Sequence, residues 1–175
     1  MKKQKGFSLI ELLIVVAIIL IIAAIAIPNL LRSKIAANES SAVGSVRTIG
    51  TAEVTYSSSW GTGYAAGLTQ LGGVAPCTTA TAVQACLIDP LLSITQIKSG
   101  YTFNAAGTLP DTAGILNGFE INATPTNPQT TGVRSFCDDQ IGVVKFLAAG
   151  TAIGVGGGSC AGIANAPPAS GPVGN

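Results

Sequence analysis

Glu11 has the most unusual setting of any residue in this chain that could do chemistry. It is the one charged residue between Phe7 and Leu31, in an otherwise apolar stretch. A charged side chain costs roughly 2.5 to 3.5 kcal/mol at the centre of a membrane helix, so such a group usually has a partner or a task. One role is to pair with a positive group. The other role is local, because a carboxylate near a helix start interacts favourably with the helix dipole.

Four cysteines form the second set of reactive groups, and all of them follow the apolar stretch. Four cysteines allow three pairings, and in an exported chain two disulfides are the default interpretation. Pairing Cys77 with Cys86 and Cys137 with Cys160 closes the shortest loops, and we predict this pairing. Zinc is the alternative, but the sequence has no C-x-x-C pair and no histidine. We therefore predict no metal site.

The remaining residues lack the types that catalysis usually needs. The absence of histidine excludes the usual catalytic triads and imidazole acid–base chemistry. Asp138 and Asp139 are adjacent carboxylates, which we expect in a solvated turn, with a calcium site as the less favoured alternative. The glycine-rich residues 154–158 lack the lysine and the following helix of a phosphate-binding loop. We predict no enzymatic activity and no cofactor.

Charge is sparse and unevenly placed. Charged residues make up 10% of the 175 residues, against about a quarter in typical proteins. Three lysines lie in residues 1–6, and the rest of the chain has six basic and eight acidic residues. No basic surface for nucleic acid is indicated, so we do not expect nucleic acid as a partner.

The apolar stretch is long enough to cross a membrane. Its 25 residues exceed the roughly 20 that a helix needs to span a hydrocarbon core. The basic residues before it would stay in the cytoplasm. A secretory signal peptide and a simple uncleaved anchor are alternatives, but no A-x-A-like cleavage site follows the stretch, and both leave Glu11 unexplained.

The residues GFSLIELLIVVAII, followed by AAIAIP, resemble the N-terminus of type IV pilins and of the related pseudopilins of type II secretion. The resemblance covers about residues 5 to 31. It implies cleavage after Gly6 by a prepilin peptidase, methylation of the new N-terminus at Phe7 and a role for Glu11 in filament assembly. The new amine of an incoming subunit would neutralise Glu11 of a subunit already placed, because an ion pair in lipid costs less than a lone charge.

Two positions bear on the shape of this segment. Pro28 lacks an N–H and clashes with the preceding turn, so we predict a kink near residues 24–28 in a continuous helix, with a helix break as the alternative. Leu20 stands where family members often carry glycine. Filaments of this family can have a melted section between that glycine and the proline, and Leu20 leaves the extent of melting open here.

The elements beyond Pro28 indicate an α+β fold, with a long kinked N-terminal helix packed on a small antiparallel sheet of about four strands, as in the pilin fold. Apolar residues recur at helical spacing in the amphipathic half of the helix, and we expect Glu39 on its solvated face or, alternatively, in contacts between subunits of a filament. Strand-like segments cover residues 101–104, 118–124, 134–138 and 142–147, and a short helix covers Asp89–Gln96. From Ala148 on, we expect a loose tail tethered by Cys160. The predicted divisions are a leader (1–6), a membrane or filament-core half of the helix (7–28), its amphipathic half (29–56), an irregular connecting loop (57–97), and the sheet with a disulfide-closed loop (98–175).

These observations predict a structural pilin subunit that polymerises into an extracellular type IV pilus for motility, adhesion or DNA uptake. The expected partners are other copies of the chain, the prepilin peptidase, an inner-membrane assembly platform, and membrane lipid before assembly. The chain would cross the bacterial inner membrane once and then leave it for the filament. A type II secretion pseudopilin and a monomeric membrane-anchored binding module are the alternatives.

Overall fold

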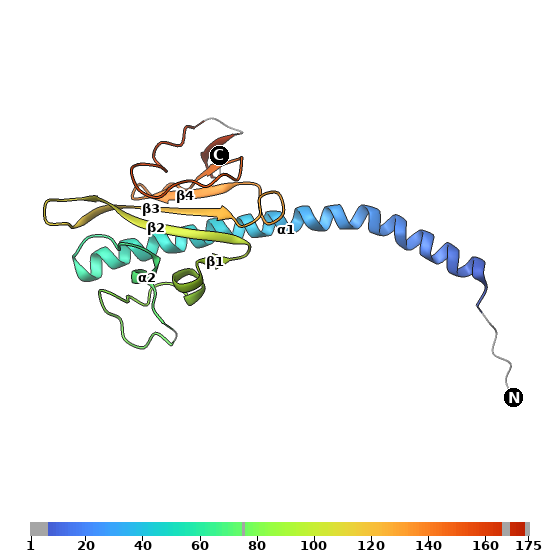
Figure 1. Ribbon diagram of the computed structural model, residues 1–175, viewed down its shortest axis with the longest axis horizontal. Helices are drawn as coiled ribbons and strands as arrows, with labels where there is room; N and C mark the ends of the chain where they lie inside the picture. The colour runs from blue at the N-terminus through green and yellow to red at the C-terminus, as the bar shows by residue number, and fades with distance from the viewer. Residues whose placement is uncertain (1–6, 75, 166–168, 174–175) are drawn as a thin grey trace. The chain divides into compact units, whose positions relative to one another are not determined.

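The computed structural model describes residues 7–74, 76–165 and 169–173 (Figure 1). Contacts divide the chain into two units at the boundary between Lys34 and Ile35. Each unit is described by itself.

Helix α1 (Leu9–Trp60) has 52 residues and belongs to both units. It contains Pro28 without an interruption, which agrees with a continuous helix rather than a break. It ends four residues beyond the predicted end at residue 56. Gly61 stops it, with φ of 62° and an N–H that donates to the carbonyl of Ser57 at 3.0 Å.

In the part of the chain that the structure describes, six strands form one antiparallel sheet, and every strand neighbours the next one in sequence. They are β1 (Ile97–Lys98), β2 (Tyr101–Pro110), β3 (Leu116–Pro125), β4 (Ser135–Asp139), β5 (Lys145–Leu147) and β6 (Ser170–Pro172). Figure 1 shows β2, β3 and β4 side by side. The predicted α+β class, with one long helix and a small antiparallel sheet, is confirmed, with two more strands than expected.

The hairpin of β2 and β3 is longer than the sequence pattern predicts. The pattern places a turn over residues 105–117, whereas β2 continues to Pro110 and β3 begins at Leu116. The true turn is centred on Asp111, whose Oδ1 accepts the N–H groups of Ala113 at 2.8 Å and Ile115 at 2.9 Å. The added strand residues are mainly Ala, Gly and Thr, which carry a weak strand signal when they are read alone.

The C-terminal tail is also more ordered than expected. Within the segment predicted to be loose, β6 pairs with β5 and places Gly171 opposite Phe146. Its sequence, Ser-Gly-Pro, has low strand propensity, so the pairing depends on the edge that β5 offers.

The segment between α1 and the sheet contains two short helices. These are α2 (Leu68–Leu71), inside the predicted irregular loop, and the π-helix η1 (Leu91–Thr95), inside the predicted short helix. Disulfides join Cys77 to Cys86 and Cys137 to Cys160, so the predicted pairing is confirmed.

The core lies between the second half of α1 and one face of the sheet. Ala42, Val46 and Ile49 of α1 share one buried cluster with aromatic residues of the strands. The opposite face of the sheet is covered by the loop of residues 150–163, which Cys160 ties to β4. The sheet is therefore buried on both faces over much of β3 and β4.

Candidate functional site

The start of α1 forms part of a capping box that the sequence analysis did not identify. Ser8 precedes the first helical residue, and the backbone N–H of Ser8 donates to Glu11 Oε2 at 2.9 Å. Ser-x-x-Glu is the sequence signature of this arrangement, in which the glutamate satisfies the N–H of the capping residue. The carboxylate of Glu11 therefore has a local partner in its own chain, and its second oxygen can still accept another donor.

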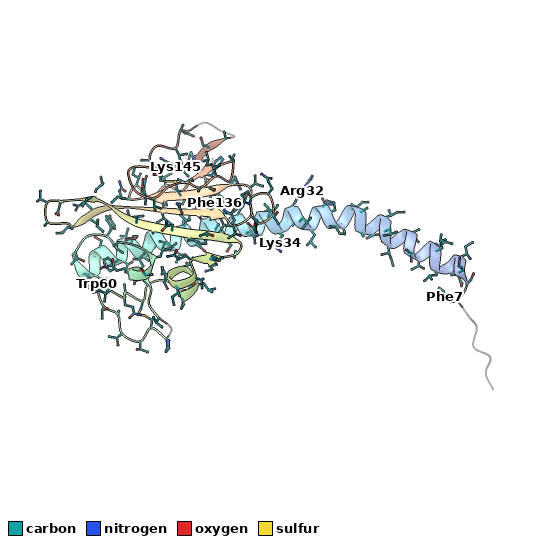
Figure 2. The ribbon with its side chains drawn as sticks, viewed as in Figure 1. Phe7, Arg32, Lys34, Trp60, Phe136 and Lys145 are labelled. Atoms are coloured by element: carbon teal, nitrogen blue, oxygen red, sulfur yellow. A yellow bond between two sulfur atoms is a disulfide. The ribbon has the colours of Figure 1, made fainter. Side chains whose placement is uncertain are left out.

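The first part of α1 exposes a continuous apolar surface. Every large apolar side chain from Phe7 to Leu31 is exposed in the isolated chain, and Figure 2 shows side chains projecting around the helix from Phe7 on. The helix is long and apolar enough to cross a membrane, by length and composition. Water is a poor solvent for such a surface, so it requires lipid or other protein as its surroundings.

The predicted processing and assembly residues lie along the first part of the chain, at the start of α1 and within it. Phe7 is 77% exposed and immediately precedes the capping residue. Leu20 is 63% exposed, and the helix is continuous from Leu20 through Pro28, without a melted section. The predicted cleavage site at Gly6 lies outside the described residues.

The second half of α1 is fixed to the sheet by one buried carboxylate. Glu39 is 7% exposed, and its Oε1 accepts the N–H groups of Val133 at 2.9 Å and Arg134 at 3.0 Å. Its Oε2 accepts Nε of Arg134 at 2.8 Å and Nη2 at 2.6 Å. The expectation that Glu39 lies on a solvated face is wrong, because Glu39 is buried against Val133 and Arg134. The sequence gives no local sign of this contact, since the partners are more than ninety residues away. This bidentate pair positions α1 against the start of β4.

A second buried carboxylate lies near the C-terminal end of α1. Glu53 is 0% exposed, and its Oε2 accepts the N–H of Ala65 at 2.8 Å. Burial raises the pKa of Glu53 to about 7, and the hydrogen bond from Ala65 lowers it by less. The contact ties α1 to the loop that follows it.

Asp138 and Asp139 do not form the predicted solvated turn. They are 4% and 2% exposed, at the end of β4, and strand alternation places them on opposite faces of the sheet. Burial raises the pKa of Asp138 to about 6, while its hydrogen bond from the N–H of Asp139 acts in the other direction. Adjacent acidic residues indicated a turn, but the strand continues through both.

Residues 1–27 match the family model for the prokaryotic N-terminal methylation motif. The chain carries the signal of type IV pilins. A 39-residue segment is 62% identical to the type IV wide pilus major component PilA4 of Thermus thermophilus. That match covers 22% of this chain and 30% of the length of the relative. No solved structure matches the chain.

The methylation motif coincides with the exposed apolar start of α1. It includes Phe7 and Glu11, together with most of the apolar surface. The resemblance to type IV pilins seen in the sequence is thereby confirmed. The sheet and the two disulfide loops lie outside the residues that the motif covers.

Proposed function

We propose that the chain is a structural subunit of a type IV pilus, cleaved after Gly6, methylated on Phe7 and polymerised through the apolar half of α1. The observation that carries the proposal is the pilin methylation motif at the start of α1, where every large apolar side chain from Phe7 to Leu31 is exposed. Such a surface marks contact with lipid or with other protein, and a subunit that passes from lipid into a filament core needs it in both states.

Glu11 would set the position of each incoming subunit. Cleavage creates an α-amine on Phe7, four residues before Glu11 and next to Ser8, which already donates to that carboxylate. The amine of a neighbouring subunit would bind the second carboxylate oxygen. In a low-dielectric filament core, opposite charges attract several times more strongly than in water, so a mismatched register would leave both charges unpaired.

The driving force is packing rather than chemistry. Moving the helix from lipid into a bundle of equal helices exchanges one apolar environment for another, so extraction would depend on an assembly platform in the inner membrane. The domain that follows would form the outer surface, and its two disulfides suit an oxidising exterior. Before assembly the chain would span the inner membrane once, and afterwards it would be extracellular.

The test is replacement of Glu11 by glutamine in the producing cell. Glutamine keeps an oxygen that can accept the Ser8 N–H but removes the charge, so it separates the capping role from the pairing role. We expect sheared filaments to fall at least tenfold while the subunit remains in the membrane fraction. Asp111→Asn, at an exposed carboxylate in the β2–β3 turn, is the matched control and should assemble normally.

Four results would contradict the proposal. Normal filament yield from Glu11→Gln would show that the charge has no role in assembly. A measured mass of the native protein that corresponds to a chain beginning at Met1 would exclude cleavage after Gly6. A subunit that is processed but never forms filaments would favour the monomeric anchor, and loss of protein secretion with intact surface filaments in a deletion strain would favour the pseudopilin.

A further inference from the structure

The face of the sheet turned away from α1 places two carboxylates side by side. Glu120 of β3 and Asp139 of β4 are direct partners in the antiparallel register. The α-carbons of such partners are about 4.5 to 5.5 Å apart and their side chains point to the same side. Two like charges directly opposite each other destabilise a sheet unless something neutralises them.

The loop of residues 150–163 covers this face through polar contacts. The N–H of Cys160 donates to Glu120 Oε1 at 3.1 Å, and the amide of Asn122 donates to the carbonyl of Ile153. The ammonium group of Lys145 donates to the carbonyls of Cys160 and Ala161, each at 3.2 Å. Lys145 is thus engaged with neutral oxygens of the loop, and neither of these two partners is a carboxylate.

One oxygen of each carboxylate has no partner. Glu120 and Asp139 are 3% and 2% exposed. Asp139 Oδ1 accepts the N–H of Ile141 at 2.9 Å, but Asp139 Oδ2 and Glu120 Oε2 accept no hydrogen bond from any described residue. An unsatisfied oxygen on a buried carboxylate costs more than a typical hydrogen bond contributes, and two on neighbouring strands require a common explanation.

Both carboxylates line a cavity of about 420 Å³, together with residues of the sheet and of the loop. Thr108 and Gln140 line it on the sheet side, and the glycine run 156–158 lines it on the loop side. A side chain at Gly118 would begin 2.7 Å from Thr108 Oγ1 and 3.1 Å from Gln140 Oε1, so both polar groups lie beside the same bare backbone position.

This set of groups has the chemistry of a hard-cation site. Among the described residues, no three His, Cys, Asp or Glu side chains gather as a metal-ligand group, so neutral oxygens must complete the coordination. Calcium accepts such mixed sets of carboxylate, amide, hydroxyl and carbonyl oxygens in flexible geometry, whereas magnesium demands a near-ideal octahedron. Both nearby cysteine sulfurs are consumed in a disulfide, which leaves no soft ligand.

We propose that Glu120 and Asp139 bind a divalent cation, with calcium preferred over magnesium, beneath the loop anchored by Cys160. The inference goes beyond the proposed function and does not depend on it. The cation would neutralise the adjacent carboxylates and join β3, β4 and the loop at a point where the loop supplies little apolar contact. Calcium sites of modest affinity commonly have dissociation constants of about 10⁻⁴ to 10⁻³ M, and we expect an affinity in this range.

The experiment uses the full-length chain in detergent micelles, stripped with EDTA and titrated with calcium chloride or magnesium chloride at constant ionic strength. We expect calcium to bind with a millimolar or lower Kd by calorimetry and to raise the Tm by several degrees, with a smaller effect of magnesium. Asp139→Asn and Glu120→Gln should each weaken calcium binding at least tenfold. Glu53→Gln is the matched control, because Glu53 is also fully buried with one unpartnered oxygen but lies on α1.

A second measurement on the unmodified chain keeps the test decisive if either variant fails to fold. Calcium should slow hydrogen exchange in residues 150–163 and in β3 and β4, relative to EDTA. Absence of calcium binding, binding that survives both substitutions, or protection confined to other segments would each overturn the proposal.

Discussion

The two faces of the β-sheet are closed by different physical means. The face toward α1 is sealed by large apolar side chains, of which Tyr101, Phe103 and Phe136 are 0% exposed. The face toward the C-terminal loop is sealed by side chain–backbone hydrogen bonds and one disulfide. The first kind of closure depends on buried area and the second on particular donors and acceptors.

The composition of each cover explains the difference. Residues 150–163 are mostly Gly, Ala, Ser and Thr, with Ile153 and Ile163 as the main large apolar groups. Such a loop buries little apolar surface, and its backbone groups need partners once the loop lies on a sheet. Glu120, Asn122 and Lys145 supply those partners, and Cys160 supplies the covalent link.

Phe136→Ala should have the largest effect, because it removes a central side chain of the apolar face. Phe136 packs against Tyr101 with ring centroids 5.9 Å apart, and the guanidinium of Arg134 lies 5.6 Å from its ring. We expect the free energy of unfolding to fall by about 3 to 5 kcal/mol. Urea denaturation of the full chain in micelles, followed by near-ultraviolet circular dichroism, measures it.

The matched control is Phe146→Ala, the register partner of Phe136 on β5, which is half-buried. Because less of the Phe146 ring is removed from water, Phe146→Ala should lower the free energy of unfolding clearly less than Phe136→Ala does. Equal losses at the two positions would mean that burial does not rank the contributions on this face.

Removal of the Cys137–Cys160 disulfide should have the next largest effect and should act on the other face. Its cysteines are separated by 23 residues, and closing such a loop stabilises by about 3 kcal/mol in the chain-entropy model. Serine at both positions should therefore lower the Tm and expose residues 150–163 to proteases while leaving the helicity of α1 unchanged.

Serine at both Cys77 and Cys86 is the control, because this disulfide has a shorter separation of 9 residues and joins neither β4 nor residues 150–163. This double substitution should lower the Tm less than removal of Cys137–Cys160 does, and it should leave the proteolysis of residues 150–163 unaltered. Intact protection of that loop after loss of Cys137–Cys160 would show that its hydrogen bonds suffice alone.

The sequence predicts the elements that local patterns specify. The apolar helix and the disulfide pairing follow from composition and short loops, and the methylation motif follows from the resemblance to type IV pilins. The extension of β2 and the pairing of β6 do not, because Ala-, Gly- and Pro-containing segments form strands there only beside a neighbouring edge.

The roles of the buried carboxylates could not be predicted from the sequence for a related reason. Glu39 has the spacing of a solvated helix residue until Arg134 is folded against it. Glu120 and Asp139 are 19 residues apart in sequence, and only the register of β3 with β4 makes them neighbours. Local patterns report which residues alternate, but the partner strand is set by tertiary structure. The Ser8–Glu11 capping contact, in contrast, was readable from the sequence.

Glu53→Gln should have the smallest effect and should appear only at higher pH. Burial raises the pKa of Glu53 from 4.5 to about 7, so the folded chain keeps this proton in a range where the unfolded chain has lost it. Its contribution to stability is fully present below pH 4.5 and is lost as the pH rises to about 7. Glutamine cannot ionise, so we expect the variant to be more stable than the native chain at pH 8 and to match it near pH 4.

The difference between the two chains is the quantity to measure, because burial raises the pKa of Asp138 to about 6 and contributes to both curves in the same direction. Urea melts from pH 4 to 8 give that difference directly. A constant offset at all pH values would mean that the amide changes packing rather than ionisation. A difference that grows with pH would show that Glu53, on the helix side of the sheet, lowers the free energy of unfolding when it ionises. The two faces would then differ in the number of their buried polar groups and in how many of these groups have hydrogen-bond partners.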